Sequence, residues 1–144
     1  LSGLTISQTD ANGKFSVPAS VKPENALALI ASAAVPAVRK FRRSSILAYA
    51  YTIYNARLDA ATSVPKLTIQ MNLYHDGNLI AEGKPTTPDL EKQADWSRIN
   101  DYSYLRLNAA VQTGEYAVQV IVRDQLATGK DAISSEWVDF EVIE

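Results

Sequence analysis

Alternation of apolar and polar residues with a period of two is the feature that most constrains the fold of this chain. It dominates from residue 45 onward, and its clearest run is Lys66–Tyr74, where leucine, isoleucine and methionine occupy every second position. A β-strand that turns one face to a core and the other to solvent produces this period, whereas a helix would distribute the same residues around its circumference. The later two-thirds of the chain is therefore predicted to form β-sheet.

Turn signals between the alternating runs divide this region into about seven strands. Asp76-Gly77 suits a two-residue hairpin turn in which both residues take positive φ, and Thr113-Gly114 and Ala127-Thr128-Gly129 mark further turns. No helical pattern separates successive strands, which disfavours a parallel α/β fold. We expect an all-β, immunoglobulin-like antiparallel β-sandwich. The expected strands are Leu4–Gln8, Ser45–Ala56, Lys66–Tyr74, Leu79–Glu82, Tyr102–Leu107, Glu115–Arg123 and Glu136–Ile143.

Length and composition indicate one packed domain spanning residues 1–144. The chain has 144 residues, of which 47% are hydrophobic, and this suits a single core. Because the sequence begins with Leu1 and not with Met, we expect it to be a fragment of a larger protein.

Residues 9–38 show no strand pattern. Three prolines interrupt them, while Ala26–Ala34 has a high helix propensity. Two interpretations stay open for this segment: a short helix within residues 23–35, or an irregular connection that runs along the sandwich.

Composition excludes several classes of function. The sequence contains no cysteine, which rules out a disulfide framework, a thiolate nucleophile and a cysteine-based metal site. A net charge of −2 and a pI near 5.4 provide no broad positive field, so we expect no nucleic-acid partner. The longest apolar stretch, Ala26–Val38, is shorter than the roughly 20 residues of a spanning helix, so we expect no membrane insertion.

Three polar motifs resemble possible sites. His75 is the single histidine and lies beside the Asp76-Gly77 turn, so we expect an exposed turn residue and not a catalytic base. Asp10-Ala11-Asn12-Gly13 begins like a calcium loop, but Val21 stands where an acidic ligand is needed, which favours a solvated turn. Arg39–Arg43 is strongly basic; a solvated loop whose side chains pair with nearby acids is preferred over a phosphate or lipid site. We therefore predict no enzyme activity, cofactor or metal.

The outward positions of the later strands carry large apolar side chains. Tyr74, Ile121 and Trp137 fall on the runs that would be strands C, F and G, which share one sheet of an immunoglobulin-like sandwich. A contiguous group of exposed aromatic and aliphatic residues is typical of a docking surface for a protein, a neighbouring domain or the face of a sugar ring. These three residues are the candidate binding site.

Two resemblances to known families add to this reading. Thr113-Gly114-Glu115-Tyr116 before an alternating strand looks like the tyrosine corner of immunoglobulin-like domains, with Tyr116 as the structural tyrosine. A second set of motifs runs through residues 39–143: Arg39-Lys40-Phe41, Leu47-Ala48-Tyr49, Ile53-Tyr54-Asn55-Ala56, Leu73-Tyr74-His75-Asp76-Gly77, Leu105-Arg106-Leu107, Gly114-Glu115-Tyr116 and Trp137–Val142. In their order and spacing these motifs resemble the carboxy-terminal region of bacterial von Willebrand factor A-related proteins.

The second resemblance implies a secreted or cell-envelope parent protein. In that setting the domain would be a non-catalytic binding or spacer module that contacts other domains of the parent or a protein partner. The alternative is a carbohydrate-binding module, or an accessory domain of a carbohydrate-active hydrolase, with a glycan as ligand. The metal signature Asp-x-Ser-x-Ser of the von Willebrand A domain itself is absent, because Leu105 stands at its last position after Asp101 and Ser103.

Overall fold

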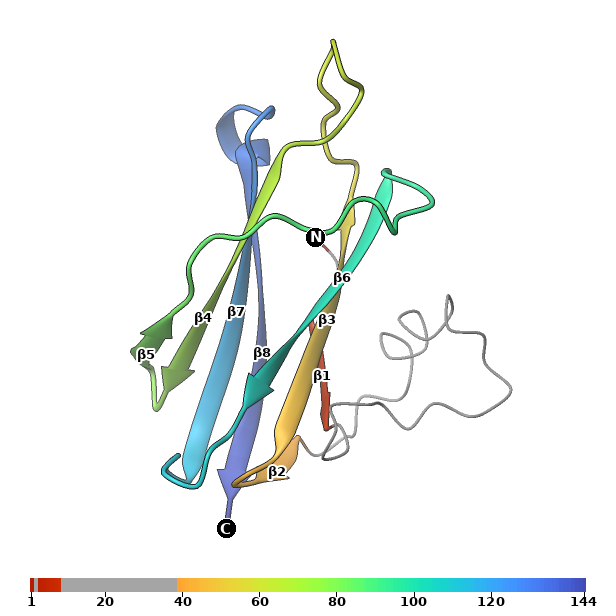
Figure 1. The fold of residues 1–144 in the computed structure, drawn as a ribbon. Coiled ribbons are helices and arrows are strands. Elements are labelled where there is room, and N and C mark those ends of the chain that lie inside the picture. Colours follow the sequence, from red (N-terminus) through yellow and green to blue (C-terminus); the bar gives the residue numbers. More distant parts are fainter. Residues whose placement is uncertain (2, 9–38) are drawn as a thin grey trace, which may run out of the picture.

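Two sheets packed face to face make up the described part of the chain, which comprises residues 1, 3–8 and 39–144 of a computed structural model (Figure 1). The all-β sandwich predicted from the alternation is confirmed. The strands are β1 (Thr5–Gln8), β2 (Lys40–Arg42), β3 (Ile46–Tyr54), β4 (Leu67–His75), β5 (Asn78–Glu82), β6 (Arg98–Arg106), β7 (Gly114–Asp124) and β8 (Ile133–Ile143), with a short 3-10 helix η1 (Gly129–Ala132) before the last strand.

The strand order is that of an immunoglobulin-like sandwich. One sheet has the order β1-β3-β6 and the other the order β2-β8-β7-β4-β5. The strands β4, β7 and β8 are neighbours and correspond to strands C, F and G, as expected. Every strand pair is antiparallel except β2 with β8, which is parallel.

The core lies between the sheets and is made by alternate side chains of the long strands. Val118 and Val120 of β7 are completely buried, as is Ile99 of β6 on the opposite sheet. Burial of each such side chain is worth about 1.5–3 kcal/mol before chain entropy is subtracted. The inward residues expected on β4, β7 and β8 are buried or half-buried: Leu67, Ile69, Met71, Leu73, Tyr116, Val118, Val120, Val122, Val138, Phe140 and Val142.

The β4–β5 hairpin forms at the predicted Asp76-Gly77 turn. Asp76 has φ 47° and Gly77 has φ 81°, and the flanking residues His75 and Asn78 pair with each other. Positive φ at both central residues is the requirement of a type I′ turn, whose twist matches that of the flanking strands. This turn starts β5 at the open edge of the five-stranded sheet.

The basic segment Arg39–Arg43 is not the loop that the sequence predicted. Its centre forms β2, in which Phe41 is buried in the core and Lys40 lies opposite Glu141. The expected pairing with acids is present: Lys40 Nζ lies 2.8 Å from Glu141 Oε2, and this bond raises the pKa of Lys40. Three residues are too few for periodicity to reveal a strand.

Strand β6 begins four residues earlier than predicted, at Arg98, and ends at Arg106. Its first half contains a single apolar residue, Ile99, so alternation is weak there; pairing with β3 over its full length imposes the strand. Leu107 is buried as expected but lies just beyond the strand end, where its N–H bonds to Ser45 O.

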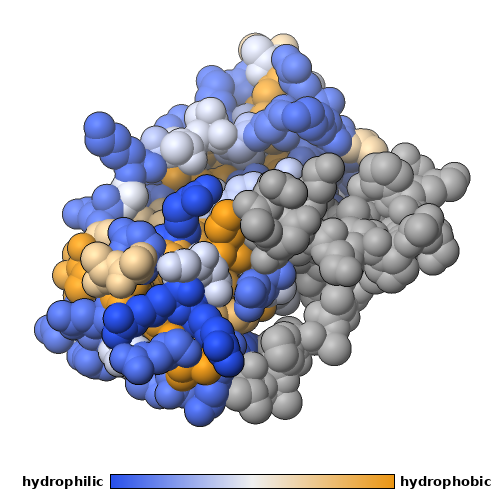
Figure 2. Space-filling view, turned by 60° about the horizontal axis from the view of Figure 1, so that its bottom comes forward, coloured by the Kyte–Doolittle hydropathy of each residue, from blue (hydrophilic) through white to orange (hydrophobic). Residues whose placement is uncertain are grey.

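Two predictions, the short helix within residues 23–35 and the turn at Asp10–Gly13, lie outside the described residues. Among residues 1, 3–8 and 39–144, no helix is long and apolar enough to cross a lipid bilayer. Figure 2 brings forward the lower end of the sandwich, and in its coloured part small hydrophobic patches are separated by hydrophilic residues. Trp137, Tyr102 and Tyr104 are exposed on the outer faces of the sheets.

Candidate functional site

Strand register brings Tyr74 and Trp137 into contact on the outer face of the five-stranded sheet. Trp137 of β8 pairs with Gln119 of β7, and Tyr74 of β4 pairs with the adjacent outward residue Ala117. The two rings are therefore diagonal neighbours, with centroids 5.0 Å apart and planes inclined by 50°. Trp137 stays 49% exposed, whereas Tyr74 is half-buried.

A row of amide side chains borders this aromatic pair. Gln119 Oε1 accepts hydrogen bonds from Tyr74 Oη and from Asn72 Nδ2, both at 3.3 Å. Gln70 Nε2 then donates to Asn72 Oδ1 at 3.2 Å and to Glu82 Oε1 at 3.1 Å. The network fixes the orientation of five side chains across β5, β4 and β7. We call Gln70, Asn72, Tyr74, Gln119 and Trp137 the platform.

Ile121, the third residue predicted for this site, lies on the same face beside the platform. It is half-buried and pairs with Gln70 on β4 and with Ser135 on β8. Alternation on three neighbouring strands thus places Tyr74, Ile121 and Trp137 on one surface. The amide row was not predicted, although Gln70, Asn72 and Gln119 alternate with core residues in the sequence and share the outward face for that reason.

Carboxylates and cations both adjoin the platform. Glu82 accepts the hydrogen bond from Gln70, and Asp139 lies opposite Ala117 and two residues from Trp137 on the same face. Arg39 Nη1 donates to Asp139 O at 3.5 Å, and Arg123 lies two residues from Ile121 on the same face. Lys40 on β2 is paired with Glu141. The platform is therefore amide-rich with a margin of mixed charge.

Tyr116 makes the hydrogen bond of a tyrosine corner. Its hydroxyl donates to Gln112 O at 2.8 Å, four residues upstream, while its ring is buried. Burial raises the pKa of Tyr116, so the phenol stays protonated and remains a donor. The ring stacks on Phe140 with centroids 5.5 Å apart, and this fixes the loop between β6 and β7 to the core.

His75 is not the exposed turn residue that the sequence predicted. Only 15% of its side chain is exposed, and its ring stacks on Tyr116 with centroids 4.4 Å apart. Its Nε2 lies 3.3 Å from Thr113 O and 3.4 Å from Asp76 Oδ2. The tyrosine corner provides an aromatic surface beside the turn, which covers the imidazole.

Sequence reasoning missed a second aromatic group, on the outer face of the three-stranded sheet. Tyr102 and Tyr104 of β6 form an edge-to-face pair with centroids 5.7 Å apart, and they are 41% and 45% exposed. Their alternation with Ser103 and Leu105 was the available signal. The rings lie apart from the platform because they belong to the other sheet.

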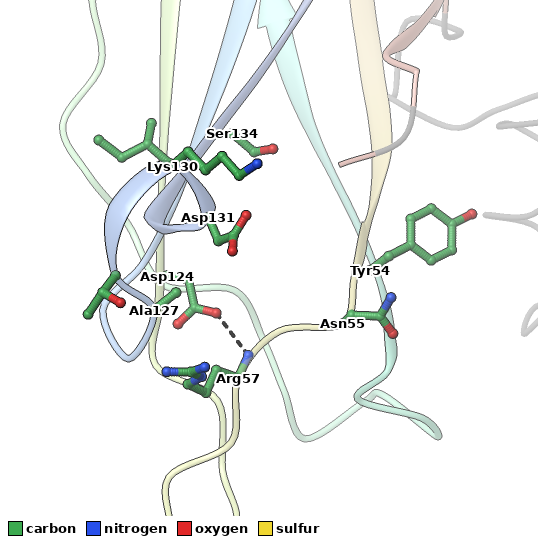
Figure 3. A pocket seen from close by; sticks show the side chains of 10 residues that line it. Tyr54, Asn55, Arg57, Asp124, Ala127, Lys130, Asp131 and Ser134 are labelled. Atoms are coloured by element: carbon green, nitrogen blue, oxygen red, sulfur yellow. Dashed lines mark hydrogen bonds between the residues drawn. The ribbon is translucent and has the colours of Figure 1, made fainter.

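A polar cleft of about 420 Å³ lies at the end of the sandwich opposite the β4–β5 turn. It is bordered by the end of β3 and the η1 segment (Figure 3). Both carboxylate oxygens of Asp124 accept backbone hydrogen bonds there, from Arg57 N at 2.8 Å and Leu126 N at 3.0 Å. Lys130 and Asp131 project from η1 on the far side (Figure 3). The central carboxylate thus holds two loops together.

Searches for relatives add no assignment to this geometry. No family model, no curated protein and no solved structure matches the chain. Within the described ranges, no group of three or more potential ligands among histidine, aspartate and glutamate is placed to hold a metal ion.

Proposed function

We propose that this domain is a non-catalytic binding module of a secreted or cell-envelope protein, and that it binds through the outer face of β4, β7 and β8. The observation that carries the proposal is the exposed Trp137 ring in contact with Tyr74, beside Ile121. An indole held at half exposure in a β-sheet exposes apolar area that a ligand can cover, and tryptophan is enriched at the centres of protein interfaces.

The non-catalytic part of the proposal is supported by what the polar groups already do. His75 stacks on Tyr116 beside the β4–β5 turn, and Asp124 in the cleft accepts two backbone N–H groups. Each group therefore has a structural role. A catalytic site instead needs an acid, a base or a nucleophile directed at a bound substrate.

The envelope location and a contact with neighbouring domains or a protein partner follow from the resemblance to von Willebrand factor A-related proteins. They are part of the proposal for that reason. The Tyr74–Trp137 contact supports a ligand surface of either chemistry, protein or glycan, because aromatic side chains serve both.

Hydroxyl-radical footprinting tests whether the face is covered in the native setting. The purified chain is compared with the complete protein in the cell-envelope fraction that contains it, and oxidation is read by mass spectrometry at Trp137. Tyr102, exposed on the opposite sheet, is the matched control.

We expect several-fold slower oxidation of Trp137 in the envelope fraction and an unchanged rate at Tyr102. Equal rates at Trp137 in the two preparations would overturn the proposal. Equal slowing at both positions would also overturn it, because that result would show general shielding and not a contact at the platform.

A further inference from the structure

We propose that the platform binds a neutral saccharide, with one pyranose ring lying on Trp137. This inference rests on the function proposed above and names the ligand class for the same face. Three features of the described residues carry it: the half-exposed indole, the oriented amide row and the uncharged nature of all five platform side chains.

The aromatic part fits the apolar face of a sugar. A pyranose has a face of C–H groups and a rim of hydroxyl groups, so its face suits an exposed aromatic ring. Trp137 offers this ring, and the neighbouring Tyr74, inclined by 50°, forms one wall beside it. The sheet beneath both residues restrains them, so little side-chain freedom is lost on binding.

The amide row fits the hydroxyl rim. An amide offers both hydrogen-bond donors and acceptors, as a hydroxyl does. An aliphatic ligand surface would leave these amide groups without hydrogen-bond partners. Gln119 Oε1 is engaged by Tyr74 and Asn72, and its amino group takes no part in this network. That amino group belongs to the residue directly opposite Trp137, where it can donate to a hydroxyl of a stacked ring.

The uncharged side chains of the platform favour a neutral ligand over an anionic one. None of the five pairs with the negative charge of a uronic acid, a sulfated sugar or a phosphate. At the border, the carboxylates of Glu82 and Asp139 lie beside the cations Arg39 and Arg123. The same carboxylates accept hydrogen bonds from uncharged hydroxyl groups. A neutral oligosaccharide is thus favoured over an anionic ligand.

Nuclear magnetic resonance tests the inference on the unmodified protein. The two indole N–H signals, from Trp96 and Trp137, are followed while cellohexaose, N-acetylchitohexaose and maltohexaose are added separately to millimolar concentration. We expect at least one of the three to shift the Trp137 signal and leave that of Trp96 in place. Trp96 is an internal control because its Nε1 donates to Leu90 O, in the loop before β6.

Three variants then locate the binding. We expect Trp137→Ala to weaken binding of the active saccharide by about tenfold or more, and Gln119→Leu to weaken it severalfold while keeping the indole. Tyr102→Ala removes an exposed ring from the other sheet and should leave the affinity unchanged. Thermal unfolding of each variant checks the fold, and the shifts of the unmodified protein decide the question if a variant fails to fold.

The outcomes separate this inference from the proposed function. No shift of Trp137 with any of the three saccharides overturns the saccharide ligand, as does binding that survives Trp137→Ala. If footprinting still shows Trp137 covered in the envelope fraction, the proposed function stands with a protein as the ligand. If Trp137 is uncovered there, the proposed function itself fails.

Discussion

The side-chain amide of Gln93 forms two hydrogen bonds with the backbone of Asn100, as a neighbouring strand would. Gln93 Nε2 donates to Asn100 O at 2.9 Å, and Asn100 N donates to Gln93 Oε1 at 3.1 Å. Asn100 lies in β6, the edge strand of the three-stranded sheet. An exposed strand edge is a template for pairing with other chains, so the glutamine protects this edge at one position.

Removal of the Gln93 amide should expose the Asn100 backbone. We expect Gln93→Ala to lower the free energy of unfolding by about 1–2 kcal/mol and to speed exchange of the Asn100 amide hydrogen by about tenfold. Gln93→Glu keeps the acceptor for Asn100 N–H but loses the donor, so the amide should remain protected. Hydrogen exchange followed by nuclear magnetic resonance measures the exchange rate of the Asn100 amide in both variants. Equal rates in the two variants would contradict the hydrogen bond from Asn100 N to Gln93 Oε1.

Gly114 permits the close approach of the β6–β7 loop to His75. Its φ is +137°, and a Cβ at this position would lie 2.8 Å from His75 Nε2. We expect Gly114→Ala to destabilise the fold by about 2–4 kcal/mol, through strain at positive φ and the steric clash. Urea unfolding measures the change.

Gly129 is the matched control for this steric effect, because it has φ +65° and a Cβ added there would meet no atom within 4 Å. Gly129→Ala should cost only the backbone strain of about 1–2 kcal/mol. His75→Ala should recover part of the loss in the Gly114→Ala background, and a double-mutant cycle without coupling would refute the clash.

The Tyr116 hydroxyl should contribute to stability apart from its ring. Tyr116→Phe removes the hydrogen bond to Gln112 O and keeps the stacking on Phe140. We expect a loss of about 1–2 kcal/mol, because the ring is buried and the carbonyl loses its partner. Tyr102→Phe, on an exposed ring, should change stability by less than about 0.5 kcal/mol. Chemical denaturation compares the two variants. Similar small losses of stability in both would exclude a role for the hydrogen bond between Tyr116 and Gln112.

Asp101 should make stability depend on pH. It lies on the β6 edge strand, where Tyr51 Oη donates to its carboxylate, and burial raises its pKa above the usual 3.8. Because the folded state favours the protonated carboxyl, its contribution is fully present below the unfolded pKa and is lost as pH rises through the folded pKa. Asp101→Asn removes the ionisable group and keeps an acceptor for Tyr51.

We therefore expect Asp101→Asn to gain stability relative to the unmodified protein as pH increases from about 3 to 7. Urea midpoints at several pH values measure the difference between the two proteins, in which the titration of other carboxylates cancels. A difference that stays constant over this range would show that Asp101 is not desolvated in the folded state.

Most of the sheet was predictable because one face of each long strand is buried. On β7 the alternation is strict from Tyr116 to Val122, and the structure buries those four alternate residues. The hairpin turn was predictable for a different reason, since Asp76-Gly77 tolerates positive φ at both positions. Both signals are local in the sequence.

Features that depend on distant partners were not predictable. Strand β2 exists because Lys40–Arg42 meets Glu141–Ile143, about a hundred residues later, and its parallel direction has no local signal. His75 is covered only because Tyr116 lies opposite it on β7. Asn72 has a polar side chain at an outward position but is buried, since Gln70, Gln119 and Tyr74 surround it.

The candidate site likewise combines features that have a local sequence signal with features that depend on distant partners. Period two assigned Tyr74, Ile121 and Trp137 to the outer face, but the contact between the two rings depends on the relative register of β4, β7 and β8. The hydrogen bonds of the amide row depend on side-chain conformations as well, which no spacing rule supplies.

The parallel pairing of β2 with β8 determines how the sandwich would respond to mechanical force. Arg39 O accepts from Glu141 N at 2.8 Å and Ile143 O accepts from Arg43 N at 3.2 Å, so bonds flank both ends of the short strand. Tension between the chain entering β2 and the chain leaving β8 would pull these strands along their axes in opposite directions. The bonds would then share the load in shear and break together, and would not peel apart one after another.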